Sequence, residues 1–416
     1  MFQTLKYLIL GLFRFLLLLI TSLSQEIKSS QFSFDLKRIV VLCFLSAIIP
    51  LLIVWNYIGL FLDDYLFDNW NSVVVYEPTF IVGNARSGTT WVHRLLALDE
   101  TMFTSVRTWE LLFAVSITWK KLFSSIYIMD DVYLKGSIYY ILRVAECYLL
   151  YGVSLRCFRR SDYLHVVGLM EVEEDEWLMV YIGYAQLITL FFPLGIHTAS
   201  LSDVISWNQV RPGDYELAET KNLIFRFFRS CVQKHLFWKQ QYMDELAGIA
   251  HKPRSRTQLR YLSKNPAFTM RIPALYDEFP DCRVVCLLRD PCASIPSMVS
   301  YIAHVWSIFS SPKFKYPEAS TLLDFCIAHY MYPCQQLASP LRPENQWAFV
   351  YYSDLLVVKD PVSGECRCNL RDTMMQLLDR LYYSNASVTS KSNVKNKALG
   401  DILDSEAAAS LASKEL

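Results

Sequence analysis

The sequence predicts an α/β protein, in which helices flank a parallel sheet and an N-terminal transmembrane helix precedes it. Short apolar segments, each followed by polar residues and a helical pattern, predict the sheet. One of them runs into a glycine-bounded turn, FIVGNARSGTTW at 80–91, which predicts a phosphate cradle at a helix N-terminus. A charge-free stretch at 39–62 predicts the membrane helix.

The N-terminal region is basic on one side of this stretch and acidic on the other. Before the stretch lie Lys28, Lys37 and Arg38, and after it lie Asp63, Asp64 and Asp68. Because cationic flanks stay in the cytosol, we expect the following domain to face the secretory lumen, as in a Golgi membrane protein. The chain has no net charge, which argues against a nucleic-acid-binding protein.

Two further apolar runs leave alternatives open. Residues 7–20, interrupted by Arg14, fit a second span, an interfacial helix or a degenerate signal sequence. Residues 178–197 follow the acidic cluster 171–177. We predict that they form a buried or membrane-apposed helix of the catalytic domain rather than a span.

The organisation along the chain follows from these features. Residues 1–38 form a basic, partly hydrophobic head, residues 39–62 the membrane helix, residues 78–385 a single α/β domain and residues 386–416 a polar tail. Strands are expected within 78–83, 258–263, 283–288 and 346–352. The carboxyl ends of parallel strands are where ligands bind in such sheets.

The eleven cysteines fit either a disulfide framework or a set of buried thiols. None shows the C-x2-C spacing of a zinc site, and no metal is expected. Asn385 begins the one glycosylation sequon.

The turn has the chemistry of an anion site. Gly83 ends the strand, Gly88 permits close backbone approach, and the amides and hydroxyls of Ser87, Thr89 and Thr90 stand at a helix N-terminus, where the helix dipole favours anions. Arg86 adds a clamp for a phosphate or sulfate. Thr89 stands where nucleotide hydrolases carry the lysine that reaches the β- and γ-phosphates.

A second strand end carries CLLRDPCASIPSMVSY at 286–301. Arg289 ends the strand, Pro291 begins a helix and Ser297 lies on that helix, so arginine and serine together suit a second phosphate. Lys264 lies at the end of its own predicted strand.

These motifs together resemble the sulfotransferases that use 3′-phosphoadenosine-5′-phosphosulfate, in particular the branch with bacterial and membrane-anchored members. The similarity lies in RSGTTW, HRLLALDE, KNP, FPD and RDP with its following serine, in that order over about 78–302, and more weakly in YYSDLLVVKDP within 346–361. The resemblance implies a P-loop-like α/β fold, a sulfotransferase activity and this donor as co-substrate, without a metal.

The resemblance also implies roles for individual residues. Arg86, Ser87, Gly88, Thr89 and Thr90 would hold the 5′-phosphosulfate, and Arg289 and Ser297 would bind the 3′-phosphate. Lys264 would neutralise charge on the sulfuryl oxygens or the leaving phosphate. A donor of this kind needs no lysine for a γ-phosphate, so a turn arginine suffices.

The base that takes the acceptor proton has two candidates near the loop, Glu110 and His93. Glu110 matches a position where anchored members place a catalytic glutamate, and His93 lies one turn into the helix that begins at the loop. The acidic residues Glu173, Glu174 and Asp175 could contact the acceptor or begin a helix.

Other readings of the sequence remain open. No match to the Arg-Lys-Gly segment that ends soluble members is present, which puts nucleotide contacts from the C-terminal side in doubt. A nucleotide kinase or hydrolase, or a catalytically inactive membrane protein that retains the fold, are the alternatives. The acceptor, whether glycan, lipid, protein or small alcohol, is left undetermined.

Overall fold

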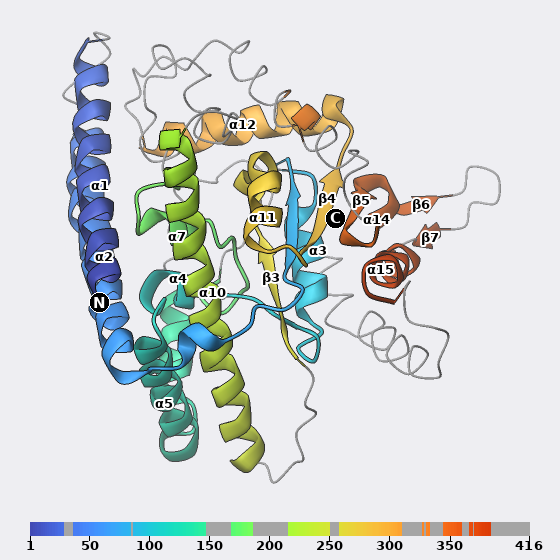
Figure 1. Cartoon of the computed structure of the whole chain (residues 1–416). Coiled ribbons are helices and arrows are strands. Elements are labelled where there is room, and N and C mark those ends of the chain that lie inside the picture. Colours follow the sequence, from blue (N-terminus) through green and yellow to red (C-terminus); the bar gives the residue numbers. More distant parts are fainter. Residues whose placement is uncertain are drawn as a thin grey trace.

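The protein is a parallel α/β sheet with helices on both faces and an N-terminal helical hairpin beside it (Figure 1). Its structure, a computed structural model, describes residues 1–28, 36–84, 86–146, 168–185, 215–249, 258–309, 327, 330–332, 344–359, 366–368 and 370–383. The described part also contains the helices α4 (Thr108–Phe113), α5 (Ile117–Leu134) and α14 (Tyr352–Leu355). The strands β6 (Val357–Lys359) and β7 (Cys366–Cys368) form a separate antiparallel pair.

The sheet has five parallel strands in the order β2-β3-β1-β4-β5. These are β1 (Thr79–Gly83), β2 (Phe103–Thr104), β3 (Arg260–Lys264), β4 (Arg283–Leu288) and β5 (Trp347–Tyr351). The sequence predicted all of them except β2, whose two residues are too few to show a periodic pattern. The parallel α/β fold predicted from the sequence is thus confirmed.

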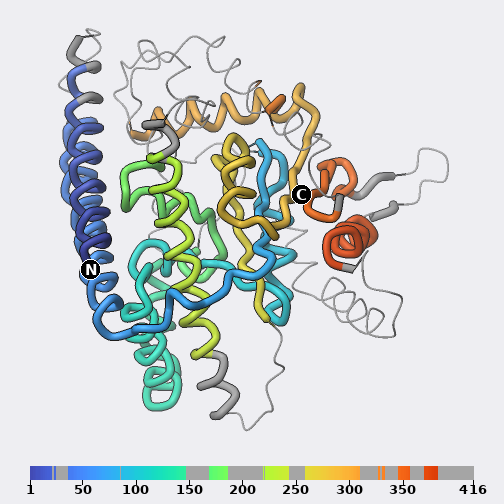
Figure 2. Tube along the Cα trace, in the orientation of Figure 1, coloured from blue at the N-terminus to red at the C-terminus, as the bar shows by residue number. Residues whose placement is uncertain are grey.

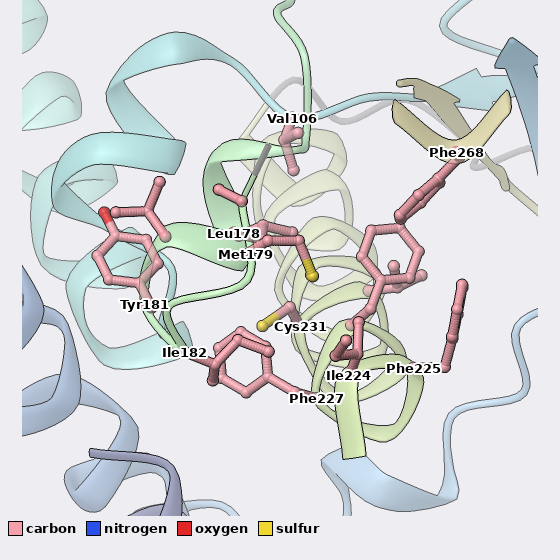
Figure 3. Packing of buried hydrophobic residues seen from close by; sticks show 14 of the residues in the cluster. Val106, Leu178, Met179, Tyr181, Ile182, Ile224, Phe225, Phe227, Cys231 and Phe268 are labelled. Atoms are coloured by element: carbon pink, nitrogen blue, oxygen red, sulfur yellow. The ribbon is translucent and has the colours of Figure 1, made fainter. Parts of the chain in front are cut away.

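The two faces of the sheet belong to two hydrophobic clusters, because side chains alternate along a strand. On β1, Phe80 and Val82 pack toward α10 (Tyr215–Ile249) and α11 (Ile272–Glu278), whereas Ile81 packs toward α3 (Thr89–Ala97) and α15 (Leu370–Leu378). The α10 side also takes in Cys231, Met179 and Phe268 (Figure 3). Every residue of β1 and β4 is buried, as expected for central parallel strands.

The N-terminal hairpin consists of α1 (Phe2–Lys28) and α2 (Leu36–Leu66), which lie side by side (Figure 2). The two helices are antiparallel, because the amino group of Met1 lies 2.6 Å from Asp64 near the end of α2. Three helices of the described part are long and apolar enough to cross a membrane by length and composition: α1 over Phe2–Ile20, α2, and α12 (Pro291–Phe309). The predicted apolar helix at 39–62 is therefore present, and residues 7–20 form part of a second one.

The apolar run 178–197, predicted to form a buried or membrane-apposed helix, is helical only at its start within its described residues. In the run 178–197, α7 (Trp177–Val180) is a short helix, and Tyr181 and Ile182 continue as a turn. These residues are buried as predicted, but the helix predicted to continue from them is wrong over 181–185. A left-handed Gly183, with φ 72°, lies in this turn, and residues 186–197 lie outside the described ones.

Five cysteines of the described part lie outside any disulfide: Cys43, Cys231, Cys282, Cys286 and Cys292. The buried-thiol alternative therefore holds for Cys231, Cys282 and Cys286. Asn385 and the tail 386–416 lie outside the described residues.

Candidate active site

The turn between β1 and α3 requires its two glycines. Gly83 has φ 129°, and a Cβ there would lie 2.5 Å from the carbonyl oxygen of Leu287. Gly88 has φ 87°, and a Cβ there would lie 2.7 Å from the ring of Tyr352. Neither position accepts a larger residue without movement of the neighbouring strand or ring. The turn is thus held close to β4 and to the start of α14.

Arg86 lies inside this turn and contacts both halves of the predicted phosphate site. Its backbone is left-handed, with φ 70°, a conformation that is costly for a residue with a side chain. Arg289 donates a hydrogen bond from Nη1 to the Arg86 carbonyl oxygen at 2.8 Å. Arg86 Nε in turn donates to Ser297 Oγ at 3.3 Å. The structure therefore brings together Arg86, Arg289 and Ser297 from two separate strand ends.

The hydroxyls and amides of the turn are placed to receive an anion. Ser87 Oγ and Asn84 Oδ1 are buried and have no hydrogen-bond partner among the described residues. Thr89 and Thr90 open α3, and the first amides of a helix have no acceptor within the helix. Buried polar atoms without a partner are rare in proteins, so their occurrence at a helix N-terminus fits a ligand there.

Lys264, at the carboxyl end of β3, is completely buried and lies against the acidic segment 173–175. Its Nζ is 2.6 Å from Glu174 Oε1 and 3.5 Å from Glu173 Oε1. Burial alone would lower the pKa of Lys264, but these two carboxylates outweigh burial and raise it. Lys264 is therefore a fixed positive charge at the ligand-binding edge of the sheet.

The rest of the acidic segment closes over the same strand end. Asp175 accepts hydrogen bonds from Tyr261 at 2.9 Å and from Asn265 at 3.2 Å. Burial raises the pKa of Asp175 to about 7, against these hydrogen bonds. Asp175 therefore belongs to the support of β3, whereas Glu174, with a side chain 29% exposed, is the accessible carboxylate.

Tyr301 connects the two halves of the site. It lies on α12, one helical turn after Ser297, and therefore on the same face of the helix. Arg86, Lys264 and Glu174 all lie within electrostatic reach of its hydroxyl. The arginine–serine group and the lysine–glutamate group therefore border one region at the carboxyl ends of β1, β3 and β4.

His93 is completely buried in α3, and its Nε2 lies 2.7 Å from Ser105 Oγ. Burial, followed by the charge of Lys264, lowers the pKa of His93 to about 3. The imidazole is therefore neutral at neutral pH and is a weak proton acceptor. Its place beside Lys264 nevertheless puts it at the edge of the candidate site.

Glu110 lies in a different group of residues. As the third residue of α4, it accepts a hydrogen bond from the Arg107 amide at 3.0 Å. Its Oε2 also lies 3.5 Å from His235 Nδ1 and 3.8 Å from Lys120 Nζ. All three side chains are buried, and His235 reaches β2 through Thr104 at 2.9 Å. The contacts of Glu110 in the described part are thus with α5 and α10 rather than with the turn.

The structure adds residues that the sequence reading did not single out. Tyr352 lies beside Gly88, and the Arg289 guanidinium lies 4.4 Å from its ring centroid. Tyr301 had a detectable signal, since it follows Ser297 by one turn. Tyr352 was recognisable only through the YYSDLL stretch, because its contact with Gly88 joins distant segments.

No group of three or more His, Cys, Asp or Glu side chains in the described part could hold a metal ion.

Comparison with known proteins agrees with this geometry. Residues 200–363 match the model of the Sulfotransferase family. Sulfotransferase STF1 of Mycobacterium tuberculosis H37Rv shares the fold, with a TM-score of 0.53, 16% identity, and coverage of 85% of this chain and 80% of that one. Sulfotransferase STF9 of Mycobacterium avium is similar, with a TM-score of 0.53, 13% identity, and coverage of 88% and 77%. No curated protein sequence matches the chain.

The family match and the structural likeness cover different lengths of the chain. The family match covers the segment that supplies β3, β4 and α12, and hence Lys264, Arg289 and Ser297. The structural likeness extends the shared fold over most of the chain. The segment 200–363 therefore matches the Sulfotransferase family, and the chain has the fold of the two mycobacterial sulfotransferases.

Proposed function

We propose that this enzyme transfers a sulfuryl group from 3′-phosphoadenosine-5′-phosphosulfate to a hydroxyl or amine acceptor. The observation that carries the proposal is the chain of contacts Arg289–Arg86–Ser297, which joins the turn after β1 to the loop and helix after β4. A donor with a phosphosulfate at one end and a 3′-phosphate at the other needs two anion sites, and this arrangement offers both.

The residues present fit such a donor. The α3 N-terminus and the partnerless hydroxyl of Ser87 suit the 5′-phosphosulfate. Arg289 uses one of its five N–H donors on the Arg86 carbonyl, which leaves the others for the 3′-phosphate beside Ser297. When bound, the donor supplies an activated sulfuryl group. The chain supplies cations and amides that stabilise negative charge on the leaving phosphate.

The acceptor is best placed on the β3 side of the site, at Lys264 and Glu174. Lys264 keeps its charge at neutral pH and can stabilise charge that develops on the sulfuryl oxygens. Glu174 is an accessible carboxylate next to it and can contact the acceptor hydroxyl. Glu110 and His93 are the candidates for the base that takes the acceptor proton. The acceptor itself is proposed only by class, as a hydroxyl or amine.

Binding of adenosine 3′,5′-bisphosphate, measured by calorimetry in the absence of magnesium, tests the donor. We expect binding by the full chain, and weaker binding by Arg86→Ala and Arg289→Ala. Magnesium-dependent binding of ATP with no affinity for the bisphosphate would overturn the proposal in favour of a kinase or hydrolase. Binding of the bisphosphate without transfer to any acceptor would identify the inactive alternative.

Attachment to a membrane is part of the proposal and is supported by the length and composition of α1 and α2. Placement of the domain in the secretory lumen, in the Golgi, remains a prediction from the charges that flank residues 39–62. It requires α2 to cross the bilayer. Protease protection in sealed vesicles measures it directly, because a lumenal domain survives until detergent is added.

A further inference from the structure

The outer face of the α1–α2 hairpin is mostly apolar, with the exposed charges Lys6 on α1 and Lys37 at the start of α2. Between Ile39 and Leu66, no exposed residue of α2 is charged. The large exposed side chains of the two helices are Phe2, Leu5, Ile9, Phe13, Leu16, Leu17 and Ile20 of α1, and Leu36, Ile39, Val40, Phe44, Leu51, Val54, Trp55, Ile58, Leu62, Tyr65 and Leu66 of α2. They recur every three or four residues, which places them on one side of each helix.

The inner face of the same hairpin belongs to the core of the catalytic domain. Tyr7, Phe15, Leu45, Ile53 and Tyr57 are buried in the hydrophobic cluster that also contains the α10 face of the sheet. This packing is specific, because the Tyr7 and Phe227 rings meet edge to face at 5.1 Å. The hairpin is therefore a layer of the domain rather than an anchor separated from it.

Polar contacts fix this packing near both ends of α2. At one end, Asp63 accepts hydrogen bonds from the amides of Ile117 and Thr118 and pairs with Lys234 at 3.0 Å. At the other end, Arg38 donates to the carbonyl oxygen of Phe309 at 2.6 Å. Residues 38–63 extend over roughly 37 Å at about 1.5 Å per residue. This length exceeds the hydrocarbon core of a bilayer, about 30 Å, so protein covers one side of α2 over the full thickness of a membrane.

Three of the six charges that suggested a membrane crossing, Arg38, Asp63 and Asp64, are used in contacts within the protein. Arg38 and Asp63 are both buried, and Asp64 pairs with the Met1 amino group. Arg14, which interrupts the apolar run of α1, donates to the Gly183 carbonyl oxygen at 3.0 Å and lies 3.6 Å from the Tyr184 ring centroid. These residues report the packing of the hairpin on the domain and carry little information about the side of a membrane.

The third apolar helix cannot join the hairpin in a bundle of spans. Figure 1 shows α12 running across the direction of α1 and α2. Its residue Ser297 accepts a hydrogen bond from Arg86 in the candidate site. A helix that lines a polar site and runs across the other two does not cross the same bilayer beside them.

We propose that the enzyme binds a lipid bilayer from one side, with the outer face of the α1–α2 hairpin inserted into one leaflet. The occupant of this face is lipid hydrocarbon, because a helix satisfies most of its backbone hydrogen bonds internally and α2 exposes no charge between residues 39 and 66. The hairpin then lies along the membrane and holds the domain against it. This topology replaces the crossing on which the lumenal prediction depends, and it stands independently of the donor and acceptor.

Cysteine labelling in sealed vesicles tests the topology on the full chain. Lys37, at the start of α2, and Asp68, just after its end, are exposed polar residues that flank the apolar face and are replaced by cysteine in separate variants. The exposed native Cys292 reports the side on which the domain lies. A membrane-impermeant maleimide is added before and after detergent, and each site is read by mass spectrometry. If the enzyme binds from one side, both introduced cysteines are labelled under the same condition as Cys292, either before or only after detergent is added. Labelling of one before detergent and of the other only afterwards would overturn the proposal.

Charge substitution tests the occupant. Flotation with vesicles of phosphatidylcholine and phosphatidylserine should be lost, by at least ten-fold, in the triple variant Phe13→Glu, Phe44→Glu and Leu51→Glu. A matched control, Ile327→Glu with Met331→Glu, alters exposed apolar residues outside the hairpin and should float as the unchanged protein does. A dimer that the triple variant dissociates, together with no flotation of the unchanged protein, would show that a second copy covers the face. Circular dichroism and a cooperative thermal unfolding transition show that the triple variant is folded.

Discussion

The guanidinium of Arg289 donates a hydrogen bond to the backbone carbonyl of Arg86 at 2.8 Å, and so one proposed phosphate ligand holds the backbone of the other. The Arg86 backbone is left-handed, and its side chain reaches Ser297 on α12. Because the contact is between a side chain and a carbonyl, the loop after β4 fixes the shape of the turn after β1. The two proposed anion sites are therefore coupled through the protein by this contact.

Replacement of Arg289 by alanine should weaken binding of adenosine 3′,5′-bisphosphate by roughly 30- to 1,000-fold, corresponding to about 2–4 kcal/mol. The loss combines a missing charge on the phosphate with a turn that is less well held. Calorimetry without magnesium measures it. Arg371→Ala, on the exposed side of α15, is the control and should bind as the unchanged protein does. Unchanged affinity in Arg289→Ala would remove this residue from the donor site.

Gly88→Ala should abolish donor binding, whereas Gly136→Ala should not. Both glycines have positive φ, 87° and 74°, so alanine strains the backbone at either position by about 1–2 kcal/mol. Only at Gly88 would the new Cβ also meet a ring, that of Tyr352, since nothing lies within 4 Å of the Cβ at Gly136. Thermal unfolding and bisphosphate titration of both variants separate strain from contact. Equal binding by the two variants would show that the approach of Tyr352 to Gly88 is unimportant.

Lys264→Gln should lower kcat by roughly 10²–10³-fold, because a preorganised charge at the reacting group is lost. The same change leaves Glu173 and Glu174 without their buried partner and should destabilise the fold by about 3 kcal/mol. The double variant with Glu174→Gln should be less destabilised than the sum of the single variants, because the two side chains lie 2.6 Å apart. Denaturant unfolding and steady-state kinetics measure both effects. Strict additivity of the stabilities would mean that the pair does not interact in solution.

Glu110→Gln tests the base that the sequence favours. If Glu110 takes the acceptor proton, the variant loses kcat by roughly 10²–10⁴-fold while bisphosphate affinity is nearly unchanged. We expect an added loss of stability of about 1–3 kcal/mol, since Glu110 lies in a buried group with Lys120 and His235. His93→Gln should reduce kcat less. The roles are reversed if His93→Gln abolishes turnover with donor binding intact while folded Glu110→Gln keeps near-normal rates.

His93 should make the stability of the enzyme depend on pH. Its pKa falls from 6.5 to about 3 on folding, so between these values the unfolded chain binds a proton that the native state does not. Stability therefore rises with pH through this window and is lost as pH falls from about 6.5 toward 3. The free energy of unfolding of His93→Gln, measured by urea denaturation at pH 4–7, should fall less steeply with acid than that of the unchanged protein. Parallel curves would show that the buried imidazole does not contribute.

The sequence by itself determined the parallel α/β fold and four of the five strands, and it predicted that Arg86, Arg289 and Ser297 would lie near one another. These features are local: an apolar run marks a buried strand, and Gly83 and Gly88 mark a tight turn wherever it is placed. Arg86, Arg289 and Ser297 could be predicted because each lies at the end of a strand or the start of a helix, and parallel strands end at the same edge.

Only the tertiary structure decided which groups meet. The strand β2 owes its existence to pairing with β3 rather than to its two residues. The Lys264–Glu174 pair and the Tyr352–Gly88 contact join segments far apart in sequence, whose proximity no periodic pattern encodes. The hairpin shows the same limit. Composition gives an apolar helix, but burial of Arg38 and Asp63 against the domain depends on what packs beside it, because one hydrophobic sequence suits both lipid and a protein core.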